Sequence, residues 1–101
     1  MLFSRLLSWW RGCRSLPHLR FVLYTRIGCH LCEAAQEELA RAQGRYLFPL
    51  ETVDIDTDPA LVAMYGELVP VVAVNGEVRF RGQVNRILLE RFLQAESRRR
   101  R

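Results

Sequence analysis

The stretch Leu-Tyr-Thr-Arg-Ile-Gly-Cys-His-Leu-Cys at residues 23–32 decides how this sequence is interpreted. It begins in a run of β-forming residues, passes through a turn that contains glycine, and ends on two cysteines three positions apart. After it, apolar residues recur at helical spacing until Gly44 stops the pattern: Leu31, Ala34, Ala35, Leu39 and Ala42. A strand, a turn, a cysteine pair and a helix are therefore expected to follow one another directly.

The chain around this stretch continues to alternate between strand and helix patterns. Residues 19–25 are nearly continuous in apolar residues, which is typical of a central strand buried on both faces. Residues 47–55 form a second extended run, interrupted by Pro49. Asp58-Pro59 is a favoured helix start, with Asp58 as the cap, so we expect a short helix over residues 60–65.

The last third of the chain predicts a hairpin and a terminal helix. Asn75-Gly76 is a favoured two-residue turn and joins the extended runs at residues 71–74 and 78–81. Asn85 is placed to cap a final amphipathic helix. The order is βαβαββα, which predicts an α/β fold with a four-stranded mixed sheet flanked by helices. In that sheet the first two strands are parallel and the last two form the hairpin.

The charges are concentrated at the ends of the chain. The 101 residues include fifteen arginines, no lysine and eleven acids, for a net charge of +4. Residues 1–20 carry +4, residues 21–97 carry −4 and residues 98–101 carry +4. A nucleic-acid-binding face needs clustered cations on a folded surface, so we expect no nucleic-acid partner.

The chain length predicts one domain, which we place at residues 18–97, with an extension before it and a basic tail at residues 98–101. Residues 1–17 are acid-free and would be amphipathic if helical. Three interpretations stay open for them: weak membrane-surface contact through residues 1–16, a transit peptide, or an extension that packs on the domain or is disordered.

No stretch approaches the roughly 18 apolar residues that a membrane-spanning helix needs. Three cysteines are too few for a secreted disulfide framework, and a lone C-x-x-C is typical of an intracellular redox pair. We therefore expect a cytoplasmic protein of bacterial type, or one of the mitochondrial matrix if residues 1–17 are a transit peptide.

The cysteine pair has a spacing that suits disulfide exchange. A cysteine in the first turn of a helix has its thiolate stabilised by unsatisfied N–H groups, and Cys29 is expected there. Cys32, one turn further, is expected on the same side but more buried, so it would resolve a mixed disulfide. Arg26 and His30 either add positive potential beside Cys29 or are solvated loop residues.

The same spacing also supplies half of a tetrahedral zinc site. A ligand set of Cys13, His18, Cys29 and Cys32 is arithmetically possible, but it requires the extension to fold back on the cysteine loop, and no metal site is expected. A metal-delivery module using the same pair, and a membrane-proximal adaptor with an inactive fold, remain as alternatives.

A second feature lies far from the cysteines, where Val69-Pro70 directly precedes the strand at residues 71–74. Together with the C-x-x-C this pattern resembles the thioredoxin superfamily. The match is closest to short glutaredoxin-like proteins and extends from about residue 20 to residue 94. It is carried by residues 23–32, Val-Asp-Ile-Asp at 53–56, Tyr-Gly at 65–66 and Val-Pro-Val-Val at 69–72.

The resemblance implies roles for several residues. It implies a cis peptide bond before Pro70 and a Val69 backbone that pairs with the bound substrate. Arg26 matches a basic residue that binds a glutathione carboxylate in glutaredoxins. Asn85 stands where an acidic residue caps the last helix, and a neutral side chain cannot form an ion pair with the glutathione amino group.

The function that follows is a glutaredoxin-like thiol–disulfide oxidoreductase, with Cys29 as nucleophile and Cys32 as resolving cysteine. Its expected substrates are protein disulfides or glutathione mixed disulfides, and its electron donor is glutathione or a reductase. No cofactor is expected to bind tightly, although glutathione is a possible co-substrate. We expect a monomer.

Overall fold

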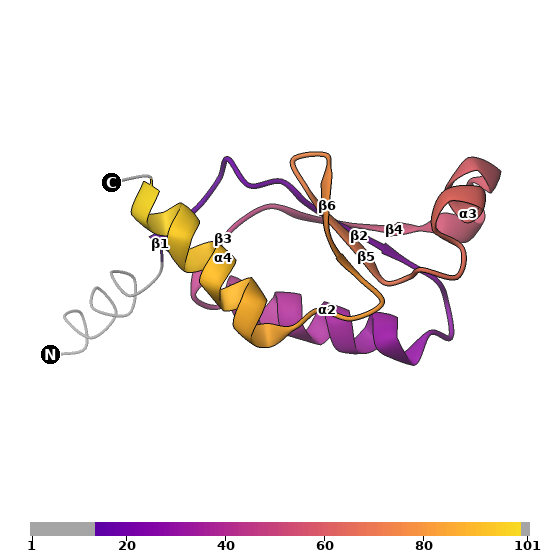
Figure 1. Cartoon of the computed structure of the whole chain (residues 1–101), viewed down its shortest axis with the longest axis horizontal. Helices are drawn as coiled ribbons and strands as arrows, with labels where there is room; N and C mark the ends of the chain where they lie inside the picture. Colours follow the sequence, from indigo (N-terminus) through magenta and orange to yellow (C-terminus); the bar gives the residue numbers. More distant parts are fainter. Residues whose placement is uncertain (1–13, 100–101) are drawn as a thin grey trace, which may run out of the picture.

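The computed structural model describes residues 14–99 and shows an α/β arrangement around one mixed sheet (Figure 1). In chain order, the elements are β1 (Arg14–Ser15), β2 (Phe21–Thr25), α2 (His30–Gln43), β3 (Tyr46–Leu47), β4 (Leu50–Asp54), the 3₁₀ helix η1 (Ile55–Thr57), α3 (Pro59–Tyr65), β5 (Val71–Val74), β6 (Glu77–Arg81) and α4 (Arg86–Arg99).

The four-stranded sheet has the order β4-β2-β5-β6. The central strand β2 pairs in parallel with β4 and antiparallel with β5, so that Leu23 lies opposite Thr52 on one side and Val72 on the other. The hairpin of β5 and β6 turns at Asn75-Gly76, where both residues have positive φ, 53° and 82°. The predicted fold class and hairpin are confirmed.

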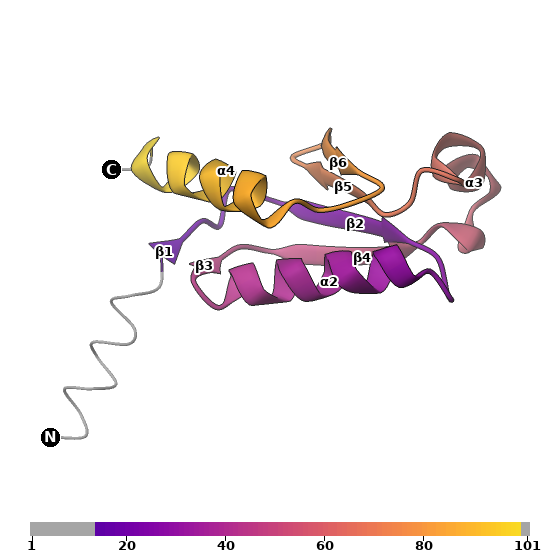
Figure 2. The same ribbon diagram turned by 60° about the horizontal axis from the view of Figure 1, so that its bottom comes forward.

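Helices α2 and α4 share one face of the sheet. Their buried side chains belong to the same apolar cluster as alternate residues of β2 and β5, namely Phe21, Leu23, Val72 and Val74. Successive strand residues point to opposite faces, and on the opposite face Tyr24 contacts Tyr65 of α3, with ring centroids 4.8 Å apart. Figure 2 shows α3 at one end of the molecule and β1, β3 and the C-terminal end of α4 at the other.

The structure includes part of the predicted N-terminal extension in the folded region. Arg14 and Ser15 form strand β1, which pairs in parallel with β3, and Leu16 is buried in the core with 1% exposure. Arg14 and Ser15 are therefore extended rather than helical, because the strand at Tyr46–Leu47 offers hydrogen-bonding groups that β1 satisfies. The apolar stripe of residues 2–10 lies outside the described residues, so its three interpretations stay predictions.

Two other boundaries differ from the expected ones. The extended run at residues 47–55 consists of two strands that are separated at Phe48-Pro49, and its last residue begins η1. Helix α4 continues through Arg98 and Arg99, two residues into the segment predicted as a tail, since basic side chains are favoured at a helix C-terminus. Within residues 14–99, no helix is long and apolar enough to cross a membrane.

Candidate active site

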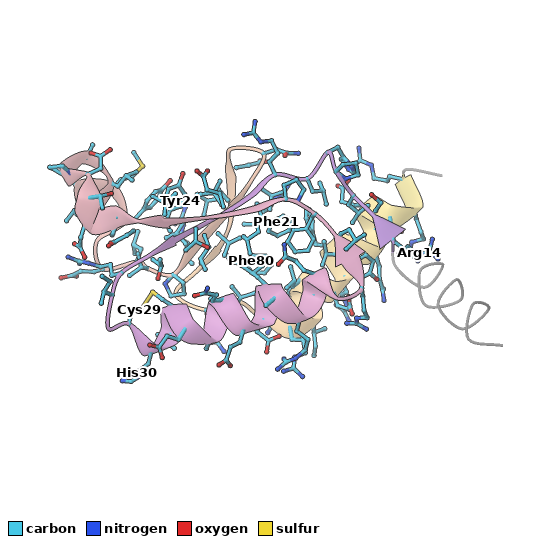
Figure 3. All side chains as sticks on the ribbon, turned by 180° about the vertical axis from the view of Figure 1, so that it is seen from behind. Arg14, Phe21, Tyr24, Cys29, His30 and Phe80 are labelled. Carbon is cyan, nitrogen blue, oxygen red and sulfur yellow. A yellow bond between two sulfur atoms is a disulfide. The ribbon has the colours of Figure 1, made fainter. Side chains whose placement is uncertain are left out.

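The two cysteines lie at the N-terminal end of α2, where the loop from β2 enters the helix (Figure 3). Cys29 is the N-cap residue, and its Sγ accepts a hydrogen bond of 3.2 Å from the Cys32 backbone N–H. The pair forms a disulfide, with the two Cα atoms 5.2 Å apart. A sulfur at this position faces the unsatisfied N–H groups and the positive end of the helix dipole, which stabilise a thiolate.

The two sulfur-bearing residues differ in exposure. Cys32 is buried, with 2% of its surface exposed, whereas Cys29 is half-buried. The loop before them turns at Gly28, whose φ of 82° favours glycine. Thus Cys29 is within reach of a second molecule, and Cys32 is reached through Cys29.

Sheet pairing brings the Val69-Pro70 segment to the end of the strand that leads into the cysteine loop. Because Tyr24 pairs with Val71 in the antiparallel β2–β5 ladder, Pro70 lies beside the carboxyl end of β2. The Val69-Pro70 peptide bond is cis, as the resemblance predicted.

Gly82 holds this segment in place. Its N–H lies 3.1 Å from the Leu68 carbonyl oxygen and 2.7 Å from that of Pro70, and it donates to both. Val69 lies between Leu68 and Pro70, and its own N–H and C=O have no hydrogen-bond partner among residues 14–99. Val69 therefore has one backbone donor and one backbone acceptor available for a strand-like segment of another molecule.

Arg26 does not extend freely beside Cys29. Its Nε and Nη2 donate to the two carboxylate oxygens of Asp56, at 3.2 and 2.7 Å, and its Nη1 donates to the Gly66 carbonyl oxygen at 3.1 Å. The hydrogen bond from Arg26 lowers the pKa of Asp56, and the same bond raises the pKa of Arg26. The guanidinium thus links the cysteine loop to η1 and to the end of α3.

A family model described as Glutaredoxin-like domain (DUF836) matches residues 20–94, which include every residue of the site described above. The chain belongs to this family. The match confirms the family expected from the resemblance.

The chain is also similar to an uncharacterized protein and to a solved structure. The uncharacterized protein Rv0508 of Mycobacterium tuberculosis is 36% identical over 59 residues, which are 54% of this chain and 61% of that protein, so the match spans less than two thirds of its length. The structure of protein XcR50 from X. campestris is 35% identical with a TM-score of 0.63 and covers 74% of this chain and 96% of its own.

A more distant structure shows the fold alone. A mutant thioredoxin from Halobacterium salinarum is 16% identical, with a TM-score of 0.62, over 80% of this chain and 76% of its own. This glutaredoxin-like domain therefore has the thioredoxin fold.

Two further predicted residues lie at helix starts in the glutaredoxin-like domain. His30 is the first residue of α2, and its side chain is 98% exposed, with Nδ1 4.0 Å from a Glu33 carboxylate oxygen. Asn85 caps α4 as predicted, because its Oδ1 accepts a hydrogen bond of 3.1 Å from the Leu88 N–H. The structure thus gives Asn85 a capping contact and leaves His30 largely in solvent.

The zinc set considered from the sequence is not assembled. The His18 ring nitrogen lies 3.3 Å from a Glu96 carboxylate oxygen, near the C-terminal end of α4, while Figure 3 shows Cys29 at the opposite end of the molecule. Among residues 14–99, no group of three or more His, Cys, Asp or Glu side chains is placed to hold a metal ion. Cys13 lies outside the described residues.

Sequence reasoning missed Asp56 as part of this site, although a signal was present. The parallel β2–β4 ladder pairs Thr25 with Asp54, so the residues that follow the two strands emerge at the same edge of the sheet. Arg26 and Asp56 are among those residues, and their opposite charges then bring them together. The exposed apolar side chains around the cysteines, Ile27, Leu31 and Leu68, were also missed, because exposure is not visible in a sequence pattern.

Proposed function

We propose that this protein is a dithiol oxidoreductase that exchanges its Cys29–Cys32 pair with disulfides of other molecules. The observation that carries the proposal is the asymmetry of the pair: an accessible sulfur at the N-cap of α2 is bonded to a buried one in the first turn. This arrangement suits a nucleophile and a resolving thiol, which is the minimum that disulfide exchange requires.

The reaction balances with two thiols and one disulfide. The Cys29 thiolate attacks one sulfur of the substrate disulfide, forming a mixed disulfide and releasing the other substrate sulfur as a thiolate. The deprotonated Cys32 sulfur then attacks the Cys29 sulfur and releases the second substrate thiolate. The substrate gains two electrons, the cysteine pair loses two, and two equivalents of thiol from a donor restore the reduced pair.

The surrounding residues support both steps. The Cys32 N–H that donates to the Cys29 Sγ, together with the end of α2, stabilises negative charge on the attacking sulfur. The unpaired backbone groups of Val69 suit an extended substrate segment, which would hold the disulfide opposite Cys29. The two steps as proposed use neither His30, whose side chain lies in solvent, nor Asn85, whose side chain caps α4, and their predicted part in substrate binding stays a prediction.

The proposal includes the partners expected from the sequence. Substrates are protein disulfides or glutathione mixed disulfides, and the donor is a reductase or glutathione, in a reducing cytoplasm or mitochondrial matrix. No cofactor other than these thiols takes part. The exchange needs only one copy of the chain, because both sulfurs and the Val69 segment belong to one domain.

The test compares single-cysteine variants in a disulfide reduction assay. We expect Cys29→Ser to reduce the rate constant by at least about 10³, because a serine hydroxyl cannot serve as the attacking sulfur. Cys13→Ser is the matched control and is expected to retain the wild-type rate. A Cys29→Ser variant that retains full activity would contradict the proposal, and a wild-type protein that reduces no disulfide would favour an inactive adaptor.

A further inference from the structure

The arginine of the cysteine loop is already occupied by the protein itself. Arg26 precedes Cys29 by three residues, in the loop that presents the sulfur. Its guanidinium has five N–H donors, and Nε and Nη2 are directed at the two oxygens of Asp56, while Nη1 is directed at the Gly66 carbonyl. An incoming carboxylate would have to displace Asp56 to obtain the same forked contact.

The charges around Arg26 add to this effect. Asp54 acts on the guanidinium in addition to Asp56, and Glu67 lines the same shallow pocket as Arg26. The carboxylates of Asp56 and Asp54 thus act directly on Arg26, and Glu67 adds a further negative charge to the lining of the pocket. A substrate that carries carboxylates close to its disulfide meets a site with a net negative charge, which repels it.

Several other exposed side chains of this surface are large and apolar. Ile27 and Leu31 flank Cys29 in the sequence and are 90% and 55% exposed. Leu68, next to the unpaired Val69 backbone, is 46% exposed. Large apolar side chains gathered at a reactive site favour apolar residues of a partner over charged ones.

We infer that Asp56 is a specificity-determining residue, which occupies Arg26 and so directs the site toward disulfides flanked by neutral or apolar peptide rather than toward disulfides that carry carboxylates. The inference rests on the proposed function and deepens it, because it names the substrate class of the same site. Asp56 acts through Arg26 and is a positioning residue.

The experiment uses two substrates that differ in the charge of two carboxyl groups, which are free in one and methyl esters in the other. Both are mixed disulfides of one peptide thiol, the first with glutathione and the second with glutathione whose two carboxylates are esterified. The second-order rate constant for reduction of each by the fully reduced, full-length protein is measured in a single turnover. The readout is the rate constant for the free-acid substrate divided by the rate constant for the ester substrate. A change in the reactivity of Cys29 affects both rate constants equally and therefore cancels in this ratio.

We expect Asp56→Asn to raise this ratio roughly fivefold, since it frees a surface guanidinium for the substrate carboxylate. Asp58→Asn is the matched control: it removes the same charge two residues away, keeps a side-chain oxygen for the α3 cap, and is expected to leave the ratio unchanged. Arg26→Gln is expected to lower the ratio, because the negative charge of Asp56 is then no longer neutralised by a guanidinium and repels the substrate carboxylate. Asp56→Ala serves as a second variant and is expected to raise the ratio in the same direction.

The outcomes separate the inference from the proposed function. An unchanged ratio in both Asp56 variants, or an equal rise in Asp58→Asn, overturns the inference while leaving disulfide exchange intact. If the reduced wild-type protein reduces neither substrate, the proposed function itself fails. A structural disturbance alone would change both rate constants together and would not move the ratio.

Discussion

The two ends of α2 differ in how firmly they are held. At the N-terminal end, His30 and Leu31 are exposed and Cys29 is half-buried. Toward the C-terminal end, Leu39 is fully buried and Glu38 is held by two arginines. The comparison indicates that the exposed face of the first turn is available to another molecule, while the buried Cys32 behind it and Leu39 further along hold the helix against the rest of the protein.

Each of these two regions contains a forked contact between an arginine and a carboxylate. Arg26 binds Asp56 through Nε and Nη2, and Arg86 binds Glu38 through the same two atoms, at 2.7–3.2 Å in both cases. The first fork joins the cysteine loop to η1 at the sulfur end, whereas the second joins α4 to α2. Figure 2 shows α2 running along the sheet. Similar geometry therefore joins α4 to α2 at one end, and at the other end it holds Arg26, to which we assign a part in substrate selection.

The largest expected effect concerns the sulfur end. In Cys32→Ser the first attack proceeds but the second cannot, so the mixed disulfide between Cys29 and the substrate should accumulate to near completion. Intact-mass measurement after mixing with a peptide disulfide detects the added peptide. The control Cys29→Ser should form no adduct, and an adduct on that variant of equal amount would reverse the assigned roles.

The anchored end is expected to dominate stability. Leu39→Ala should lower the free energy of unfolding by about 3 kcal/mol, because it leaves a cavity in a fully buried part of the core. Leu31→Ala removes the same atoms from the same helix, but at an exposed position. It should change the free energy of unfolding by less than about 0.5 kcal/mol. Denaturant unfolding measures both, and equal losses would show that α2 is not anchored asymmetrically.

A smaller effect is expected at the Glu38 fork. Hydrogen bonds from Arg86 are the main cause of the lowered pKa of Glu38, so this carboxylate stabilises the fold in its charged form. Glu38→Gln should lower the free energy of unfolding by about 1 kcal/mol at pH 7. Glu37→Gln is the control, because Glu37 is exposed on the same helix.

The difference in the free energy of unfolding between wild type and Glu38→Gln should depend on pH in one direction. A depressed carboxyl pKa contributes stability that is fully present above the usual glutamate value of 4.5 and is lost as the pH falls through the lower folded value. The stability of wild type and Glu38→Gln should therefore converge in acid. Unfolding curves from pH 7 to pH 3 test this, and a gap that widened in acid would contradict it.

Local signals explain what could be predicted from the sequence. The turn at Asn75-Gly76 and the caps at Asp58 and Asn85 depend on a few adjacent residues, and all three have the expected geometry. The cysteines at the start of a helix follow from the strand-turn-helix pattern around them. These features need no knowledge of the rest of the chain.

Two features that depend on distant parts of the chain were not predicted. Strand β1 exists because it meets Tyr46–Leu47, about thirty residues away, and two residues provide no periodicity to detect. The link from Arg26 to Asp56 requires the register of β2 and β4. The sequence therefore identifies the cysteine pair, whereas the contact between Arg26 and Asp56 becomes visible only in the fold.

The central claim is that Cys29, at the N-cap of α2, is the reactive thiol of the pair. The most direct measurement is the rate of alkylation of the fully reduced protein as a function of pH, with the modified cysteine identified by peptide mass spectrometry. We expect Cys29 to react first, with a midpoint below the pKa of a free cysteine, because the helix end and the Cys32 N–H stabilise its thiolate. Equal rates at Cys29 and Cys32, or a Cys29 midpoint at or above that of a free thiol, would contradict the account.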